Sequence, residues 1–231
     1  MFIIKNKIQY CNIDKNEYNN TNKTMDQKNI IYEQLLLIST SKNAVLLSLP
    51  NVINWLLGDL SFLHFTPVSK TQDNKVLKQL EDNWGRNTLR IIRPDLKLDK
   101  QWTNKFGEYI CEELFTLLGH TVNVPVAINN MKPDLETKTT IIEVKTQTYF
   151  TSGTAGEKIL GCPFKYVDIP YLYEKKLVIV CLGGAEKVSR EQYGNLPGRK
   201  CTVKKQELLD LYKTLSIEFI GATDLVKQLL E

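Results

Sequence analysis

Apolar residues are spaced along the chain in patterns that predict helices first and a mixed α/β segment afterwards. Between residues 30 and 57 the spacing, interrupted by Pro50, fits helices packed on one side. Residues 66–99 are polar and basic, and we expect them to form a solvated face. From 102 to 118 apolar residues recur every three or four positions and Gly119 follows, which predicts a helix with a glycine stop.

β-branched runs separated by turn residues predict strands after this helix. Residues 122–149 are expected to form a meander of three strands joined by short turns. The order beyond residue 100 is therefore a helix, three strands, a helix and a strand. The further expected elements are a helix at 164–173, a strand at 176–182, a helix at 206–215, a strand at 217–220 and a helix at 223–230.

Three segments of the chain differ in composition. Residues 1–29 are crowded with Asn, Lys and Asp, and we expect a mobile polar arm. Residues 30–100 are expected to form a mainly helical region. Residues 101–231 are expected to form an α/β (α+β) core, in which helices flank a mixed β-sheet, followed by C-terminal helices.

The overall composition is that of a soluble globular protein. The 231 residues are 42% hydrophobic and 24% charged, which excludes a disordered chain, a fibrous repeat and a disulfide miniprotein. No charge-free apolar run approaches the ~18–20 residues that span a bilayer, so we expect no membrane association. The net charge of +4 permits a polyanionic partner without requiring one.

The cysteines and the start of the chain bear on the compartment. Five scattered cysteines without a Cys-x-x-Cys pair predict neither a disulfide framework nor a zinc cluster. The chain starts with apolar residues and lacks the basic region of a secretory signal. We therefore expect an intracellular, cytoplasmic protein with reduced thiols.

Asp134, Glu143 and Lys145 are the candidate catalytic residues, in the pattern Pro-Asp, eight residues, Glu-Val-Lys. Side chains alternate along a strand, so Glu143 and Lys145 emerge on one face ~7 Å apart while Ile142 and Val144 point into the core. The connection is long enough for a hairpin that brings Asp134 beside Glu143. Two carboxylates and an ammonium group are then expected in one cleft.

Paired carboxylates without soft ligands suit Mg²⁺, which takes a few carboxylate oxygens and keeps waters and substrate phosphates at its other positions. Such a metal polarises a phosphodiester and lowers the pKa of a bound water, while Lys145 orients that water or offsets negative charge. The pattern therefore predicts hydrolysis of a nucleic-acid backbone. Acid-x-Lys triplets also start at positions 26, 73 and 95, but only the copy at 143 lies in an apolar, β-branched run.

A further carboxylate, Glu108, follows Gly107 near the start of the predicted helix at 102–118. With it, residues 106–182 resemble the core of the PD-(D/E)xK nuclease superfamily, whose restriction-endonuclease-like fold has the order αβββαβ. The resemblance implies that Asp134 and Glu143 bind the divalent metal, that Lys145 serves the attacking water, and that Glu108 contacts the metal directly or through water. An alternative for Glu108 is a helix N-terminal acid favoured by the macrodipole.

Residues after the catalytic strand are candidates for DNA binding. Gln147 continues the face of Glu143 and Lys145, and its alternative is an ordinary exposed strand residue. The loop at 149–158 offers the hydroxyls of Ser152 and Thr154 and the charge of Lys158 to phosphates. It is similar to a DNA-contacting loop of type II restriction enzymes, and its alternative is a Gly-rich turn that caps a helix. No Walker A motif is present, so we expect no nucleotide cofactor.

These residues predict a Mg²⁺-dependent, sequence-specific endonuclease that cuts double-stranded DNA to 5′-phosphate and 3′-hydroxyl ends, with Mn²⁺ able to substitute. A homodimer would place one site on each strand, and residues 30–100 would supply recognition or dimer contacts. Two alternatives stay open. One is a structure-selective repair or Holliday-junction-resolving nuclease of the same superfamily, and the other is a non-catalytic DNA-binding module.

Overall fold

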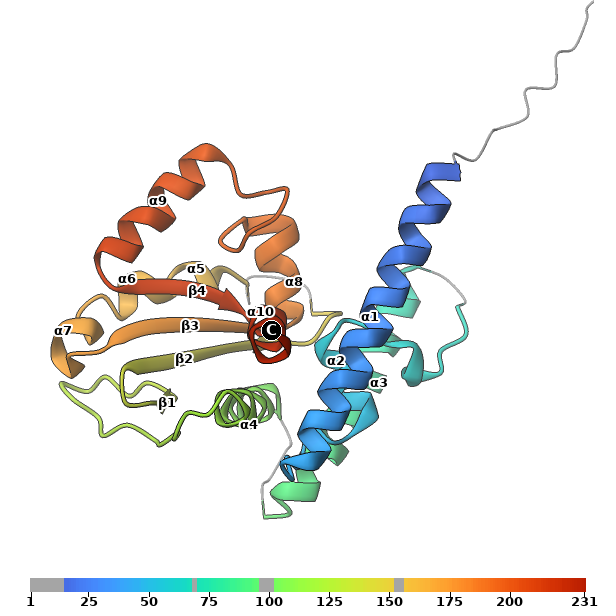
Figure 1. Cartoon of the computed structure of the whole chain (residues 1–231), viewed down its shortest axis with the longest axis horizontal. Helices are drawn as coiled ribbons and strands as arrows, with labels where there is room; N and C mark the ends of the chain where they lie inside the picture. The colour runs from blue at the N-terminus through green and yellow to red at the C-terminus, as the bar shows by residue number, and fades with distance from the viewer. Residues whose placement is uncertain (1–14, 68–69, 96–101, 152–155) are drawn as a thin grey trace, which may run out of the picture.

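The computed structural model describes residues 15–67, 70–95, 102–151 and 156–231 and contains a four-stranded β-sheet with helices on both sides (Figure 1). The elements of the N-terminal part are α1 (Lys15–Ser41), α2 (Pro50–Leu56), a 3₁₀ turn (Ser61–Leu63) and α3 (Lys70–Ile92). The remaining elements are α4 (Trp102–Leu117), β1 (Leu135–Glu136), β2 (Thr140–Gln147), α5 (Glu157–Leu160), α6 (Cys162–Lys165), α7 (Ile169–Tyr173), β3 (Lys176–Gly183), α8 (Gly184–Val188), a π-helical turn (Ser189–Tyr193), α9 (Val203–Thr214), β4 (Ile217–Gly221) and α10 (Ala222–Leu230).

The sheet is mixed, with strand order β1-β2-β3-β4. β1 is antiparallel to β2, whereas β2, β3 and β4 run parallel. The short helices α5 to α7 connect β2 to β3, and α8 and α9 lie between β3 and β4. In this register Glu143 lies beside Ile179 and Lys145 beside Cys181. The expected mixed α/β class, with helices flanking a mixed sheet, is confirmed.

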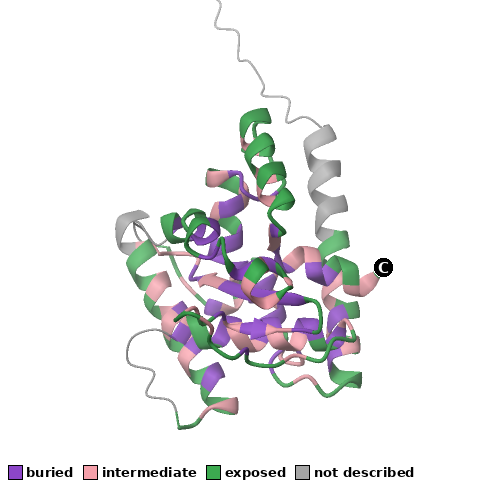
Figure 2. Ribbon diagram, turned by 90° about the vertical axis from the view of Figure 1, so that its left-hand side faces the viewer, coloured by how far each residue is buried: buried purple, intermediate pink, exposed green. Residues whose placement is uncertain are grey.

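Each face of the sheet has its own core, because alternate residues of a strand point in opposite directions. Ile142 and Val144 belong to the cluster that includes α4 and α10. Ile141 and Ile179 lie on the other face and pack against Tyr166 and its neighbours at the short helices. Burial is concentrated in the central sheet and the elements around it (Figure 2). Among the described helices none is both long and apolar enough to cross a membrane.

Trp55 on α2 joins the N-terminal helices to the sheet. Its side chain is fully buried, with ring centroids 5.4 Å from Phe106 and 5.8 Å from Tyr149, both edge-on. Its Nε1 donates a hydrogen bond of 2.7 Å to Glu81 on α3, and the Glu81 oxygens accept the backbone N–H of Tyr149 at 3.0 and 3.1 Å. The N-terminal helices and one face of the sheet therefore share a single core.

The N-terminal arm expected over residues 1–29 differs from the structure, in which helix α1 begins at Lys15. Residues 1–14 lie outside the described residues. The later part of α1 is anchored by Leu35, which is fully buried. Once a helix is anchored by packing, each added residue gains a hydrogen bond without a new nucleation cost, so a polar segment extends it.

The expected three-stranded meander is reduced to β1 and β2. At 122–128 the structure has isolated bridges at Asn123 and Ile128 in place of a strand. Pro125 has no N–H to donate to a ladder, and the neighbouring Val124 and Val126 are 68% and 80% exposed, so a strand here would bury little.

The helix expected at 164–173 is divided into α6 and α7. Pro163 and Pro170 each lie in the first turn of one of these helices. A proline lacks the N–H that an uninterrupted helix needs and its ring clashes with the preceding turn, so one helix ends before the next begins. The other expected elements are present as α4, β3, α9, β4 and α10, with small shifts of their ends.

We predict that Glu81→Gln removes part of the pH dependence of stability. Burial raises the pKa of Glu81 from 4.5 to about 7, and hydrogen bonds from Trp55 and Tyr149 act in the opposite direction. A raised folded-state pKa gives stability that is fully present below the unfolded pKa and is lost as the pH rises through about 7. Between pH 5 and pH 8 the free energy of unfolding of the wild type should fall by ~2 kcal/mol relative to the variant, at ~1.4 kcal/mol per pKa unit. Denaturant titrations at both pH values measure this difference, and parallel pH profiles would contradict it.

Gly107→Ala should destabilise the contact between α4 and β2. A methyl group at Gly107 would lie 1.7 Å from Oγ1 of Thr146, so the helix or the strand must shift. Overpacking of this kind costs ~1–3 kcal/mol of unfolding free energy. Gly161→Ala is the matched control, because its φ of −76° is helical and the nearest atom is 3.8 Å away. Equal thermal stability of the two variants would contradict close packing at Gly107.

Candidate active site

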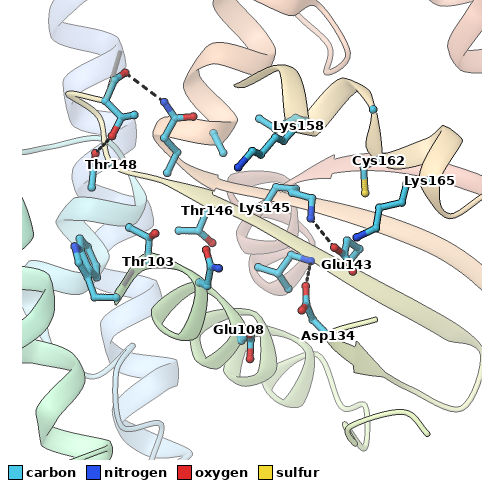
Figure 3. A pocket seen from close by; sticks show the side chains of 18 of the residues that line it. Thr103, Glu108, Asp134, Glu143, Lys145, Thr146, Thr148, Lys158, Cys162 and Lys165 are labelled. Carbon is cyan, nitrogen blue, oxygen red and sulfur yellow. Dashed lines mark hydrogen bonds and ion pairs between the residues drawn. The ribbon is translucent and has the colours of Figure 1, made fainter. Parts of the chain in front are cut away.

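A cleft of about 710 Å³ runs along β2 from Glu143 to its end, bounded by α4 and by the short helices after β2 (Figure 3). This volume is within the usual range for ligand sites, ~300–1,000 Å³. Predicted site residues gather here: Glu108, Asp134, Glu143, Lys145, Gln147 and Lys158 all line the cleft. Ser152 and Thr154 lie outside the described residues. The structure thus brings together side chains from four separate parts of the fold.

The backbone of β2 fixes both candidate metal ligands. Asp134, directly before β1, accepts the backbone N–H of Val144 at its Oδ2 with a length of 2.7 Å. β1 and β2 are antiparallel neighbours, so the expected hairpin brings Asp134 beside the Glu143–Lys145 stretch. Val144 packs in the core on the opposite face from Glu143 and Lys145, as strand alternation predicts.

In the described part of the chain, only one of the two carboxylate oxygens of the buried Glu143 has a hydrogen-bond partner. Glu143 is 4% exposed, and its Oε1 accepts a hydrogen bond of 2.5 Å from Nζ of Lys145. Its Oε2 is buried and has no hydrogen-bond partner among the described residues. Burial raises the pKa of Glu143, and the negative charge of Asp134 raises it further. A buried anionic oxygen without a partner is the environment that a cation would stabilise.

The same balance of burial and charge acts on the two neighbours of Glu143. Burial raises the pKa of Asp134, and the hydrogen bond from Val144 opposes the rise. Burial acts to lower the pKa of Lys145, but the charge of Glu143 outweighs it and the pKa is raised. Lys145 is therefore an ammonium group at neutral pH, able to donate hydrogen bonds and unable to accept a proton.

Glu108 lies in the second turn of α4 and forms an ion pair with Lys105. Burial raises the pKa of Glu108, and the negative charge of Asp134 raises it further. The two carboxylates therefore interact electrostatically. The macrodipole acts mainly on the first turn of a helix, which makes it a weak reason for an acid at this position.

The donor set fits Mg²⁺ through two carboxylates. Among the described residues no group of three or more His, Cys, Asp and Glu side chains is arranged to hold a metal ion. Mg²⁺ is commonly held by one or two protein carboxylates, with waters and phosphates as its other ligands. The unpartnered Oε2 of Glu143 and its proximity to Asp134 meet that requirement.

Gln147 and Lys158 continue the cleft beyond Lys145. Gln147 is 9% exposed, so the alternative of an exposed strand residue is wrong, and its Nε2 donates to the backbone oxygen of Thr151 at 3.3 Å. Lys158 projects from α5 into the same cleft (Figure 3). Gly156 is the N-cap of α5, so the small-residue loop also has the helix-starting role that the sequence left open.

The cleft contains further residues that the sequence patterns do not assign to the site. They come from α3, from the start of α4 and from the segment around α6: Lys78, Asp82, Trp102, Thr103, Cys162, Lys165 and Tyr166. Asp82 accepts hydrogen bonds from Lys78 at 2.8 Å and from Nε1 of Trp102 at 2.9 Å, which fixes α3 at the edge of the cleft. No local signal marks these residues, because their place depends on how distant segments pack.

Comparisons with protein-family models, with curated proteins and with solved structures found no match to this chain. The functional interpretation therefore depends on the residues of the cleft and on their chemistry.

Addition of Mg²⁺ should stabilise the protein through Glu143. A ligand that binds the folded state at about ten times its Kd adds ~1.4 kcal/mol to the free energy of unfolding. We expect a rise in thermal midpoint with Mg²⁺ for the wild type and none for Glu143→Gln. Glu136→Gln is the control, since Glu136 lies outside the cleft and pairs with Lys175. The same rise in all three proteins would place the ion elsewhere.

Proposed function

We propose that this protein is a Mg²⁺-dependent endonuclease that hydrolyses double-stranded DNA, with a core of the PD-(D/E)xK, restriction-endonuclease-like type. The observation that carries the proposal is the buried pair Asp134 and Glu143, with one unpartnered carboxylate oxygen, beside the ammonium of Lys145. A buried pair of repelling carboxylates is destabilising by itself. Its presence in a cleft lined by lysines is accounted for by a bound cation and an anionic substrate.

The residues of the cleft would have different roles in hydrolysis. Asp134 and Glu143 would hold Mg²⁺, which supplies a Lewis acid for the phosphodiester and a lowered pKa for an attacking water. The raised pKa of Lys145 keeps this side chain protonated. Lys145 therefore donates hydrogen bonds that orient the water and offset the negative charge developing on the phosphate, and does not act as the base.

The order of elements supports the proposed core. The order is a helix with Glu108, an antiparallel pair with Asp134 directly before it and Glu143 and Lys145 on it, then helical segments and the parallel strand β3. This order is one strand short of αβββαβ. The departure is the first strand of the meander, which is represented by the bridge of Asn123 to Glu136. That bridge pairs the segment with β1 on the side away from β2, the position that a shortened first strand would occupy.

The lining of the cleft favours a nucleic-acid backbone as substrate. Lys158 and Lys165 line the cleft with the carboxylates, and Lys78 does so from α3. Lysines at intervals beside a metal site suit a polyanion with repeated phosphates. Because α3 belongs to the N-terminal region and borders the cleft, we propose that residues 30–100 contribute to recognition of the target, and that a homodimer cuts the two strands.

Cleavage of DNA by the purified protein is the decisive test of this proposal. With Mg²⁺, plasmid and long linear DNA should give discrete fragments, and Asp134→Asn and Glu143→Gln should each lower the rate at least ~100-fold. Glu136→Gln should cut like the wild type. Rates on a synthetic four-way junction are measured beside these substrates.

The pattern of products separates the proposal from its alternatives. Cutting of the junction alone would replace the sequence-specific enzyme with a structure-selective resolving nuclease. Binding of DNA without cleavage of any substrate would indicate a non-catalytic module. Fragments that persist at the wild-type rate in Glu143→Gln would overturn the assignment of the site.

A further inference from the structure

The centre of the cleft has a surplus of negative charge. Asp134 and Glu143 contribute two carboxylates, and among the described residues Lys145 is the side chain that forms an ion pair with this pair of acids. A phosphate group brings more negative charge to the same place. Repulsion between like charges is strong where burial lowers the effective dielectric constant, so a second cation that faces the acids would favour phosphate binding.

Lys165 at the end of α6 is positioned to be that cation. It lines the cleft opposite β2, and its side chain extends toward Glu143 (Figure 3). Burial is the largest influence on the pKa of Asp134 and of Glu143 and raises both values, whereas the charge of Lys165 acts to lower both. Within the described ranges Lys165 forms no ion pair, so its charge is not committed to a surface acid.

Tyr166 fixes the ammonium of Lys165. The Nζ atom lies 4.3 Å from the centroid of the Tyr166 ring and donates a hydrogen bond of 2.8 Å to its hydroxyl. Tyr166 is 5% exposed and packs in the same cluster as Ile141 and Ile169. A lysine normally loses considerable side-chain entropy when it binds a ligand, and one already restrained against a rigid ring loses less.

We propose that Lys165, restrained by Tyr166, binds the substrate phosphate that lies over Asp134 and Glu143. This inference rests on the proposed function for the identity of the phosphate as part of DNA. Lys145 is paired with Glu143 and serves the attacking water, whereas Lys165 contacts the phosphate from the opposite wall of the cleft. Tyr166 is a positioning residue in this arrangement.

The test is DNA binding in Ca²⁺, measured by fluorescence anisotropy of a labelled duplex over a range of salt concentrations. Lys165→Ala should weaken binding and reduce the salt slope by ~1, the change expected when one phosphate contact is lost. Lys165→Arg should restore binding, because a guanidinium also stacks on an aromatic ring and binds phosphate. Tyr166→Phe, which removes the hydroxyl and keeps the buried ring, should weaken binding less than Lys165→Ala without changing the slope.

Lys138→Ala is the matched control for loss of one positive charge, since Lys138 lies in the turn between β1 and β2 and does not line the cleft. Thermal unfolding of each variant confirms that it is folded. An unchanged slope in folded Lys165→Ala, or an equal decrease in Lys138→Ala, would overturn the inference while leaving cleavage by the wild type intact. Conversely, a slope lowered only in Lys165→Ala, in a protein that cuts no DNA, would support the phosphate contact and contradict the endonuclease.

Discussion

The side chain of Trp55 is the contact on which the arrangement of the cleft depends. It is fully buried where α2 meets the ends of β2 and β3, and a Cβ at Gly183 would lie 2.4 Å from its ring. Its Nε1 is bonded to Glu81, and its backbone oxygen accepts the hydroxyl of Tyr149 at 2.8 Å. Separating the N-terminal helices from the sheet would expose the indole ring to water and break the hydrogen bonds that Tyr149 donates to Glu81 and to the backbone oxygen of Trp55, which is unfavourable. α3 is thereby fixed at the edge of the cleft.

The cleft combines a rigid frame with an unfavourable charge arrangement. Asp134 and Glu143 are held beside each other by the N–H of Val144 and by Lys145, although burial opposes ionisation of both acids. The cores on the two faces of β2 keep this strand from moving to relieve the repulsion. Repulsion between buried carboxylates is common at sites where a bound ligand supplies the opposite charge. A cation bound here would also account for the unpartnered oxygen of Glu143.

Much of the fold follows from patterns within short stretches of sequence. Alternation along β2 correctly separates Glu143 and Lys145 from the core residue Val144, and helical spacing correctly identifies α4. The errors lie where a local pattern competes with proline or with distant packing. The expected strand around Pro125 would bury little, because Val124 and Val126 are exposed, and residues 15–29 of the expected arm belong to α1, which is anchored further along by Leu35.

The sequence by itself determined the strand that carries Glu143 and Lys145, the return of Asp134 beside it and the helix of Glu108, because side-chain periodicity and short turns act over a few residues. Only the tertiary structure decided that Lys165 and Tyr166 face these acids, that Lys78 and Asp82 border the cleft, and that Glu81 is buried against Tyr149. These contacts join residues 20 or more positions apart in the chain. Their formation depends on which surfaces bury together, a property of the whole packed chain that no local spacing encodes.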